Sequence, residues 1–121
     1  MATYIKVNDI QYPASITGRL ADKDWDNRAS KAIKIEMAYT DAAELFVDDM
    51  EWYIVQENEV QVEKIDEEGN ATFEPSIETE EYDNSEYCIA GSITDHRDGT
   101  ITVKMGKPTA EELLIMLEEV L

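Results

Sequence analysis

The chain has little cysteine, one histidine, few basic residues and no long apolar run, and these shortages narrow the classes of protein to which it can belong. Its 121 residues contain one cysteine, Cys88, so no intrachain disulfide and no cysteine metal cluster can form, which suits a reducing compartment. The longest aliphatic run, residues 113–117, is far shorter than the roughly 20 residues of a membrane-spanning helix. The first residues also lack the pattern of an export signal, and we expect neither a signal peptide nor a transmembrane segment.

Negative charge is what the chain has in excess. It carries 28 acidic and 10 basic side chains, a formal net charge of −18, which argues against binding nucleic acid or anionic membranes through a basic face. Residues 56–86 hold twelve of the acids and one base, Lys64, so they supply −11 of that charge. With 43% hydrophobic residues the chain should still fold. We expect a single domain, residues 1–121, with an acidic hairpin or loop insertion at about 56–86.

Alternating apolar and polar residues predict strands along most of the chain. A two-residue turn at Asn8-Asp9 would pair Val7 with Ile10, which starts a first hairpin. Residues 41–50 suit a short helix with Thr40 as its N-cap. Thr109 and Glu112 form a capping box at the start of a C-terminal helix. These patterns predict an α+β fold, a mainly antiparallel β-sheet of hairpins with a short middle helix and a C-terminal helix packed on one face.

The core of this fold is predicted from the apolar positions that share one face of each element. These are Ile5, Ile16, Leu20, Ile33, Ile35, Leu45, Phe46, Trp52, Ile54, Ile93, Val103, Leu113 and Leu117. In the C-terminal helix, Ile115 and Met116 are rotated away from that face, and we expect them to contact another subunit or protein.

The only histidine lies in the stretch DHRDGTITVKMGK, where a catalytic site and a turn are alternative interpretations. Pairing Ile93 with Val103 leaves Arg97-Asp98-Gly99 as a three-residue hairpin loop with glycine at a left-handed position. His96 would then lie at the entrance to the loop, without a second histidine or a nucleophile elbow nearby in sequence. The turn is the favoured interpretation, and we assign no catalytic residue.

Asp22, Asp24 and Asp26 match the first three ligand positions of a calcium-binding loop. The sixth position is Asn27 instead of glycine, and the twelfth is Ile33 instead of the closing glutamate. The pattern favours a solvated loop anchored by Trp25 over an EF-hand, with weak calcium binding as the alternative. We therefore predict no metal site and no cofactor.

Several stretches resemble a family of short prophage-encoded proteins from Gram-positive bacteria, many of them gut Firmicutes. The likeness is carried by MATYIKVNDIQYPASITGR, DWDNRASKAI, AELFVDD and EYDNSEYCIAGSITDHRDGTITVKMGKPTAEE, while the acidic segment after Gln56 is the variable part. The family's members tend to lie among phage structural genes. The resemblance implies a non-enzymatic role in the tail or baseplate region, in the host cytoplasm or in a virion.

Three functions of different classes follow from these observations. The first is a phage structural or tail-associated protein that contacts other phage proteins or forms a homo-oligomer through its C-terminal helix. The second is an acidic regulatory protein that mimics nucleic acid and occupies a basic groove of a host or phage enzyme. The third and least favoured is a hydrolase that uses His96 or the aspartate loop.

Overall fold

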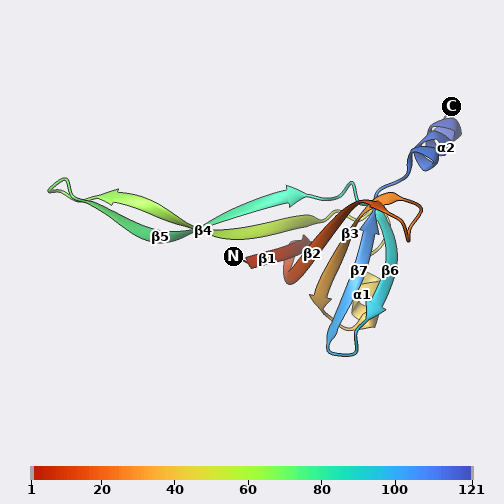
Figure 1. The fold of residues 1–121 in the computed structure, drawn as a ribbon, viewed down its shortest axis with the longest axis horizontal. Coiled ribbons are helices and arrows are strands. Elements are labelled where there is room, and N and C mark those ends of the chain that lie inside the picture. The colour runs from red at the N-terminus through yellow and green to blue at the C-terminus, as the bar shows by residue number, and fades with distance from the viewer. Residues whose placement is uncertain (1, 121) are drawn as a thin grey trace.

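The computed structural model describes residues 2–120, with side chains through residue 118. This part of the chain forms seven strands and two helices (Figure 1). In chain order they are β1 (Ala2–Val7), β2 (Ile10–Asp22), β3 (Arg28–Glu36), α1 (Tyr39–Leu45), β4 (Tyr53–Ile65), β5 (Ala71–Asp83), β6 (Ile89–Asp95), β7 (Thr100–Gly106) and α2 (Ala110–Val120). The predicted α+β, mainly antiparallel class is confirmed.

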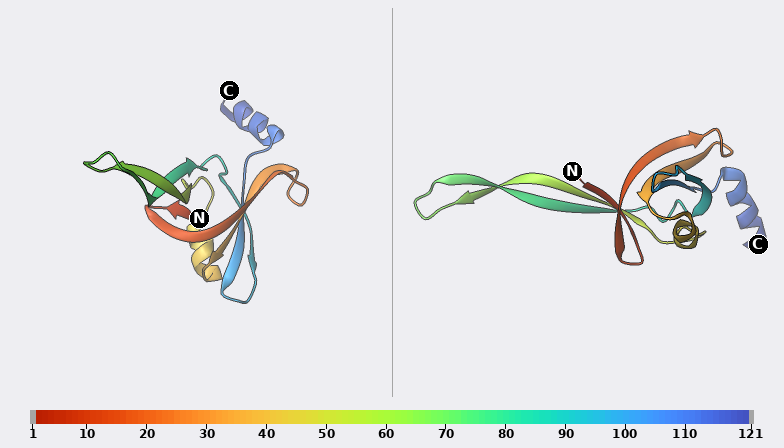
Figure 2. Two further views of the ribbon diagram at one scale, coloured as in Figure 1. Left: turned by 60° about the vertical axis from the view of Figure 1, so that its left-hand side comes forward. Right: turned by 90° about the horizontal axis from the view of Figure 1, so that it is seen from below.

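The seven strands form one antiparallel sheet in the order β5-β4-β1-β2-β3-β7-β6. The first hairpin has its predicted register, with Val7 opposite Ile10. Strand β2 first pairs with β1 and then, from Ala14, with β3, so it belongs to both halves of the sheet. The sheet curves strongly along its length (Figure 2).

The core fills the concave side of the curved sheet. Ile5 from β1, Ile33 from β3 and Val103 from β7 are fully or almost fully buried there, and Phe46, directly after α1, completes the cluster with Trp52. The helix starts one residue before Thr40, and its N-cap is Ala38, so the predicted cap is wrong. Strand β4 begins directly after Trp52, and the indole Nε1 donates a hydrogen bond to the Tyr87 carbonyl at 3.1 Å.

Six of the thirteen predicted core residues are less buried than expected. Ile16, Leu45 and Ile93 are half-buried at the margin of the core. The prediction is wrong for Leu20, Leu113 and Leu117, which are 96%, 48% and 61% exposed. Leu20 lies at a break in the β2–β3 register, between the pairs Arg19–Ser30 and Asp22–Arg28.

The hairpin of β4 and β5 extends far beyond the rest of the sheet. Within the described residues β1 pairs with β4 as far as Glu57, and β4 and β5 pair only with each other from there to the turn at residues 66–70. We call residues 58–78 the arm. The arm carries seven acidic residues and one base, a net charge of −6. Its two strands project sideways from the curved body (Figure 1).

Helix α2 does not pack on the sheet, and this overturns the predicted arrangement. It leaves the body on the side away from the arm and extends into solvent (Figures 1 and 2). The connection after Gly106 carries the chain past the end of β7 before the helix starts at Ala110, so the apolar residues of α2 never reach the concave core.

Candidate interaction surfaces

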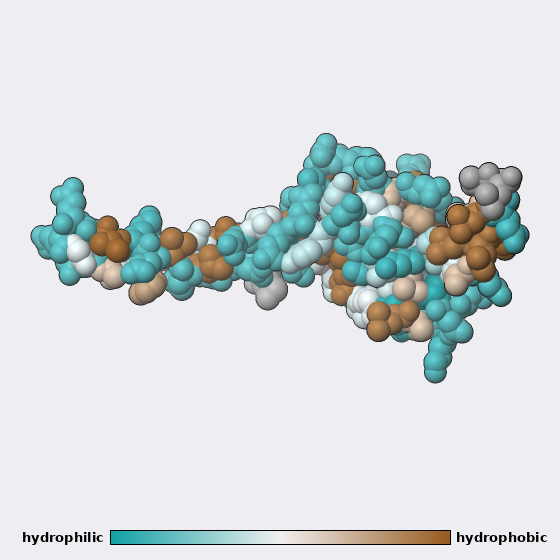
Figure 3. Space-filling view, turned by 90° about the horizontal axis from the view of Figure 1, so that it is seen from above, coloured by the Kyte–Doolittle hydropathy of each residue, from teal (hydrophilic) through white to brown (hydrophobic). Residues whose placement is uncertain are grey.

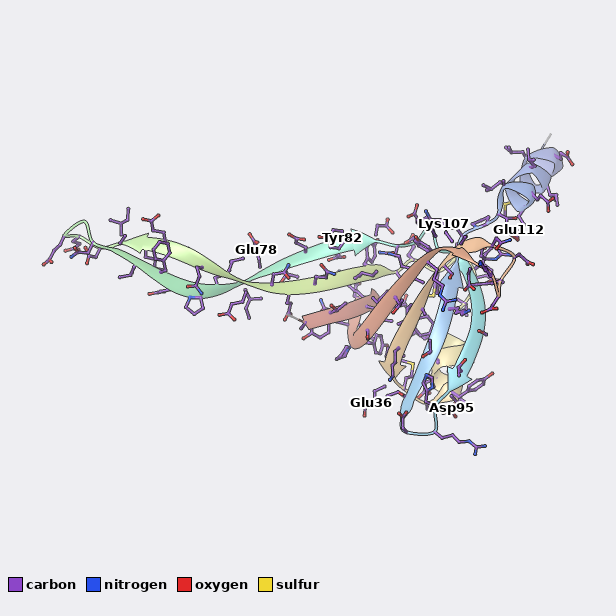
Figure 4. All side chains as sticks on the ribbon, viewed as in Figure 1. Glu36, Glu78, Tyr82, Asp95, Lys107 and Glu112 are labelled. Atoms are coloured by element: carbon purple, nitrogen blue, oxygen red, sulfur yellow. The ribbon has the colours of Figure 1, made fainter. Side chains whose placement is uncertain are left out.

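The base of α2 is fixed by one carboxylate. The Thr109 amide donates to Glu112 Oε1 at 3.0 Å and the Glu112 amide donates to Thr109 Oγ1 at 3.3 Å, so the predicted capping box is confirmed. The same Glu112 oxygen accepts a hydrogen bond from Arg28 at 2.7 Å. Figure 4 shows Glu112 where α2 leaves the body. The Thr109 amide and the Arg28 guanidinium together lower the pKa of Glu112 below its usual value. These contacts orient the helix at its first turn, and residues 113–118 beyond it are exposed.

Arg28 is itself held by the body. Its guanidinium lies 4.9 Å from the centre of the Trp25 ring and donates to the Lys107 carbonyl oxygen at 3.2 Å. The Trp25 ring lies over two glycines, Gly91 and Gly106, where a Cβ atom would come within 2.6 and 2.8 Å of ring atoms. Sequence reasoning identified Trp25 as an anchor but missed Arg28, because the ring and its partners come from four separate segments.

Five consecutive apolar residues of α2 are exposed. Their exposed fractions run from 48% to 61%, and successive residues of a helix are rotated by about 100°, so apolar groups surround the helix instead of lining one side. A helix that is apolar all round is normally enclosed. Together they make the brown cluster at the end opposite the arm (Figure 3). We call it the α2 patch: Leu113, Leu114, Ile115, Met116 and Leu117.

The arm carries a second set of exposed apolar side chains. Ile77 and Phe73 are 68% and 65% exposed, and alternation along β5 places them on one face with Pro75 and Ala71. The residues between them, among them Glu74 and Glu78, face the other way. Brown and teal residues alternate along the arm accordingly (Figure 3). On β5, therefore, one face of the arm presents exposed apolar side chains and the other presents exposed carboxylates.

The aspartates of the candidate calcium loop do not converge. Asp22 is fully buried: it accepts hydrogen bonds from Lys104 Nζ at 2.9 Å and Ser30 Oγ at 3.0 Å, whereas Asp24 and Asp26 are exposed. The Lys104 ammonium is the main reason why the pKa of Asp22 lies below its usual value. Among residues 2–118 no group of three or more His, Cys, Asp or Glu side chains is placed to bind a metal ion. The expectation of a solvated loop is wrong for Asp22, which organises the loop from inside.

His96 lies where the turn interpretation places it. Ile93 pairs with Val103, and Gly99 has a φ of +90°, so the predicted register and the left-handed glycine are confirmed. The imidazole is exposed, and its Nε2 forms a hydrogen bond of 2.7 Å with Thr102 Oγ1 on the neighbouring strand. The Asp98 carboxylate accepts from the Thr100 amide at 2.9 Å and closes the loop. These contacts account for the DHRDG stretch by backbone geometry.

Replacing Gly99 by valine should destabilise the protein by about 1–2 kcal/mol, because a β-branched residue is strained at positive φ. His96→Ala should change stability far less, since the imidazole is exposed. Urea denaturation of both variants, followed by circular dichroism, checks this. If Gly99→Val were as stable as the wild type, the turn interpretation would lose its basis.

Comparisons with protein-family models, with curated proteins and with solved structures each found no match to this chain. Neither helix within residues 2–120 is long and apolar enough to cross a membrane.

Proposed function

We propose that the chain is a non-enzymatic interaction protein of a phage or prophage, a structural or tail-associated component that assembles with other phage structural proteins or with copies of itself through α2. It would act in the host cytoplasm or in the virion. The observation that carries the proposal is the α2 patch, which stands clear of the body and is exposed all round. Burying such a patch favours association by about 25 cal/mol per Å² of apolar area.

The arrangement of the chain supports an assembly role. The α2 patch and the apolar side chains of the arm lie at opposite ends of the molecule, so both can be occupied at once (Figure 3). Glu112 and Arg28 set the direction in which α2 leaves the body, which gives a bound partner a defined orientation. The resemblance to prophage-encoded proteins supplies the phage context.

Mass spectrometry of purified particles tests the proposal. Particles from a lysogen that encodes the chain should contain it in a fixed ratio to the other structural proteins, and Ile115→Asp with Met116→Asp should abolish incorporation. Val47→Asp is the matched control, because Val47 is also an exposed apolar residue but lies outside α2 and the arm. A chain that is absent from the particles would contradict the proposal.

If the α2 patch joins copies of this chain, the affinity between the copies should depend on salt. A homo-oligomer should tighten as salt rises, because the net charge of −18 opposes bringing two copies together and salt screens that repulsion. Light scattering of the purified chain across a salt series measures this.

The acidic regulatory protein remains the second candidate, favoured by the charge of the arm. A complex with a basic groove should loosen as salt rises, the opposite of the homo-oligomer. Recovery of a nucleic-acid enzyme in a salt-sensitive complex, together with absence from particles, would favour this function.

A further inference from the structure

The outer side of β5 is a free sheet edge. Strand β5 is the terminal strand of the sheet, and all thirteen of its residues are exposed. Strand β4 pairs with it along its whole length without a register shift. An edge of this kind presents backbone groups to any extended chain that can pair with it.

The hydrogen-bond pattern shows which backbone groups face outward. The Asp66 amide donates to the Asn70 carbonyl at one end of the hairpin, and the Asn84 amide donates to the Trp52 carbonyl at the other. Hydrogen-bonded and non-hydrogen-bonded pairs alternate between antiparallel strands, and both end pairs fit one unbroken alternation through the register of β4 and β5. The odd-numbered residues of β5 therefore turn their amide and carbonyl groups to the free edge.

Proline divides this edge into two parts. Pro75 is an odd-numbered residue, so its nitrogen faces outward and the edge lacks a donor there. Prolines and charges on edge strands oppose unwanted pairing. Residues 77–83 contain no proline and offer four outward-facing residues in succession, Ile77, Thr79, Glu81 and Asp83.

Most of this segment, residues 79–83, is also the part of the edge that the body supports. Opposite Thr79, Glu81 and Asp83, strand β4 is itself paired with β1, so a strand added here would extend the main sheet. From Glu78 toward the turn, β4 and β5 pair only with each other in the described part of the chain, and an isolated two-stranded hairpin is a weak template. Figure 4 shows Glu78 at the body end of the arm and Tyr82 closer to the body.

The side chains of residues 77–83 define the chemistry of the incoming strand. Four of the seven residues carry carboxylates. One of these, Glu81, forms an ion pair with Lys6 of β1, with Lys6 Nζ 3.1 Å from Glu81 Oε1. Opposite charges on directly facing residues of neighbouring strands stabilise the pair, and like charges destabilise it. A second β5 would set carboxylate against carboxylate, and β6, the other edge strand, contains no basic residue.

We propose that residues 77–83 of β5 bind an extended, lysine- or arginine-bearing segment of a different protein by adding it to the sheet as an eighth strand. The backbone of the odd-numbered residues supplies the hydrogen bonds, and Glu78, Glu80 and Asp83 select basic side chains. Strand addition at β5 gives the proposed interaction protein a second binding surface and a class of partner. The argument for it depends on the β5 edge and not on the α2 patch.

Fluorescence anisotropy with a labelled nine-residue peptide of alternating lysine and threonine tests the proposal on the isolated chain. The peptide should bind, and Thr79→Pro should weaken it by about tenfold or more, because the outward donor is lost and the ring blocks the edge. Thr79→Val keeps the donor and should leave affinity within about twofold. Phe73→Pro makes the same backbone change beyond Pro75 and should also have little effect.

Two further probes separate strand addition from charge attraction. The same peptide with N-methyl groups on alternate residues keeps its charge but cannot pair on one edge, and it should bind about tenfold more weakly. Glu78→Lys with Glu80→Lys leaves the backbone intact and should move preference to a glutamate-bearing peptide. Equal binding of the methylated peptide, an unchanged affinity in the lysine variant, or no binding at all would each overturn the proposal, without bearing on particle incorporation.

Discussion

Replacing Trp52 by alanine should destabilise the protein by about 3–5 kcal/mol, a large share of the roughly 5–15 kcal/mol that a domain has. The indole is fully buried, and its Nε1 donates to the Tyr87 carbonyl oxygen at 3.1 Å. Its ring also meets the Tyr87 ring edge-on, with centroids 6.5 Å apart. The substitution removes a large side chain of the hydrophobic core and leaves the part-buried Tyr87 carbonyl without this donor.

Chemical denaturation followed by circular dichroism measures this loss. Trp52→Phe should cost less, because it keeps most of the apolar side chain and loses the hydrogen bond to the part-buried Tyr87 carbonyl, a bond worth about 0.5–1.5 kcal/mol. Leu20→Ala is the control, since Leu20 is 96% exposed and should change stability by less than about 0.5 kcal/mol. A Trp52→Ala variant as stable as Leu20→Ala would show that the core does not depend on the indole.

Replacing Asp22 by asparagine should lower the urea midpoint at neutral pH and flatten the loss of stability in acid. The Asp22 carboxylate is buried between Lys104 and Ser30, and it also lies 3.6 Å from the Arg19 guanidinium. The variant keeps the shape of the side chain but leaves Lys104 without its buried counter-charge. A buried ion pair that loses one partner is strongly destabilising.

The pH dependence follows from the lowered pKa of Asp22. A carboxyl group with a lower pKa in the folded state stabilises the fold fully above its unfolded value, near 3.8, and this stabilisation is lost as pH falls through the folded-state pKa. The wild type and Asp22→Asn should therefore differ most above pH 4 and converge in stronger acid. Asp24→Asn, at an exposed position of the same loop, should follow the wild type throughout. A constant difference at all pH values would contradict the ion pair as the cause.

The arm shows how far alternation in a sequence can be interpreted. Alternating residues on both sides of the DEEGN turn predicted a possible hairpin, and the structure has β4 and β5 paired over thirteen residues each. The sequence could not show that, among residues 2–120, β1 pairs with β4 only from Tyr53 to Glu57. Strand alternation reports which residues share a face, but it does not report whether another strand lies beside them.

Local geometry was determined by the sequence itself. The hairpin pairing of Val7 with Ile10, the left-handed Gly99 and the capping box of Thr109 and Glu112 each depend on residues only a few positions apart, so turn and cap chemistry suffices to define them. The antiparallel class could be predicted because the turns at Asn8-Asp9 and at Gly99 each join two neighbouring strands.

Only the tertiary structure decided what covers each element. Asp22 is buried because Lys104, 82 positions away, brings a counter-charge to it, and α2 stands in solvent because its connection leads away from the concave core. Leu113 and Leu117 have the pattern of core residues, yet they are exposed. Hydrophobic periodicity measures the tendency of a face to be buried, and the burial itself depends on long-range contacts that no local pattern contains.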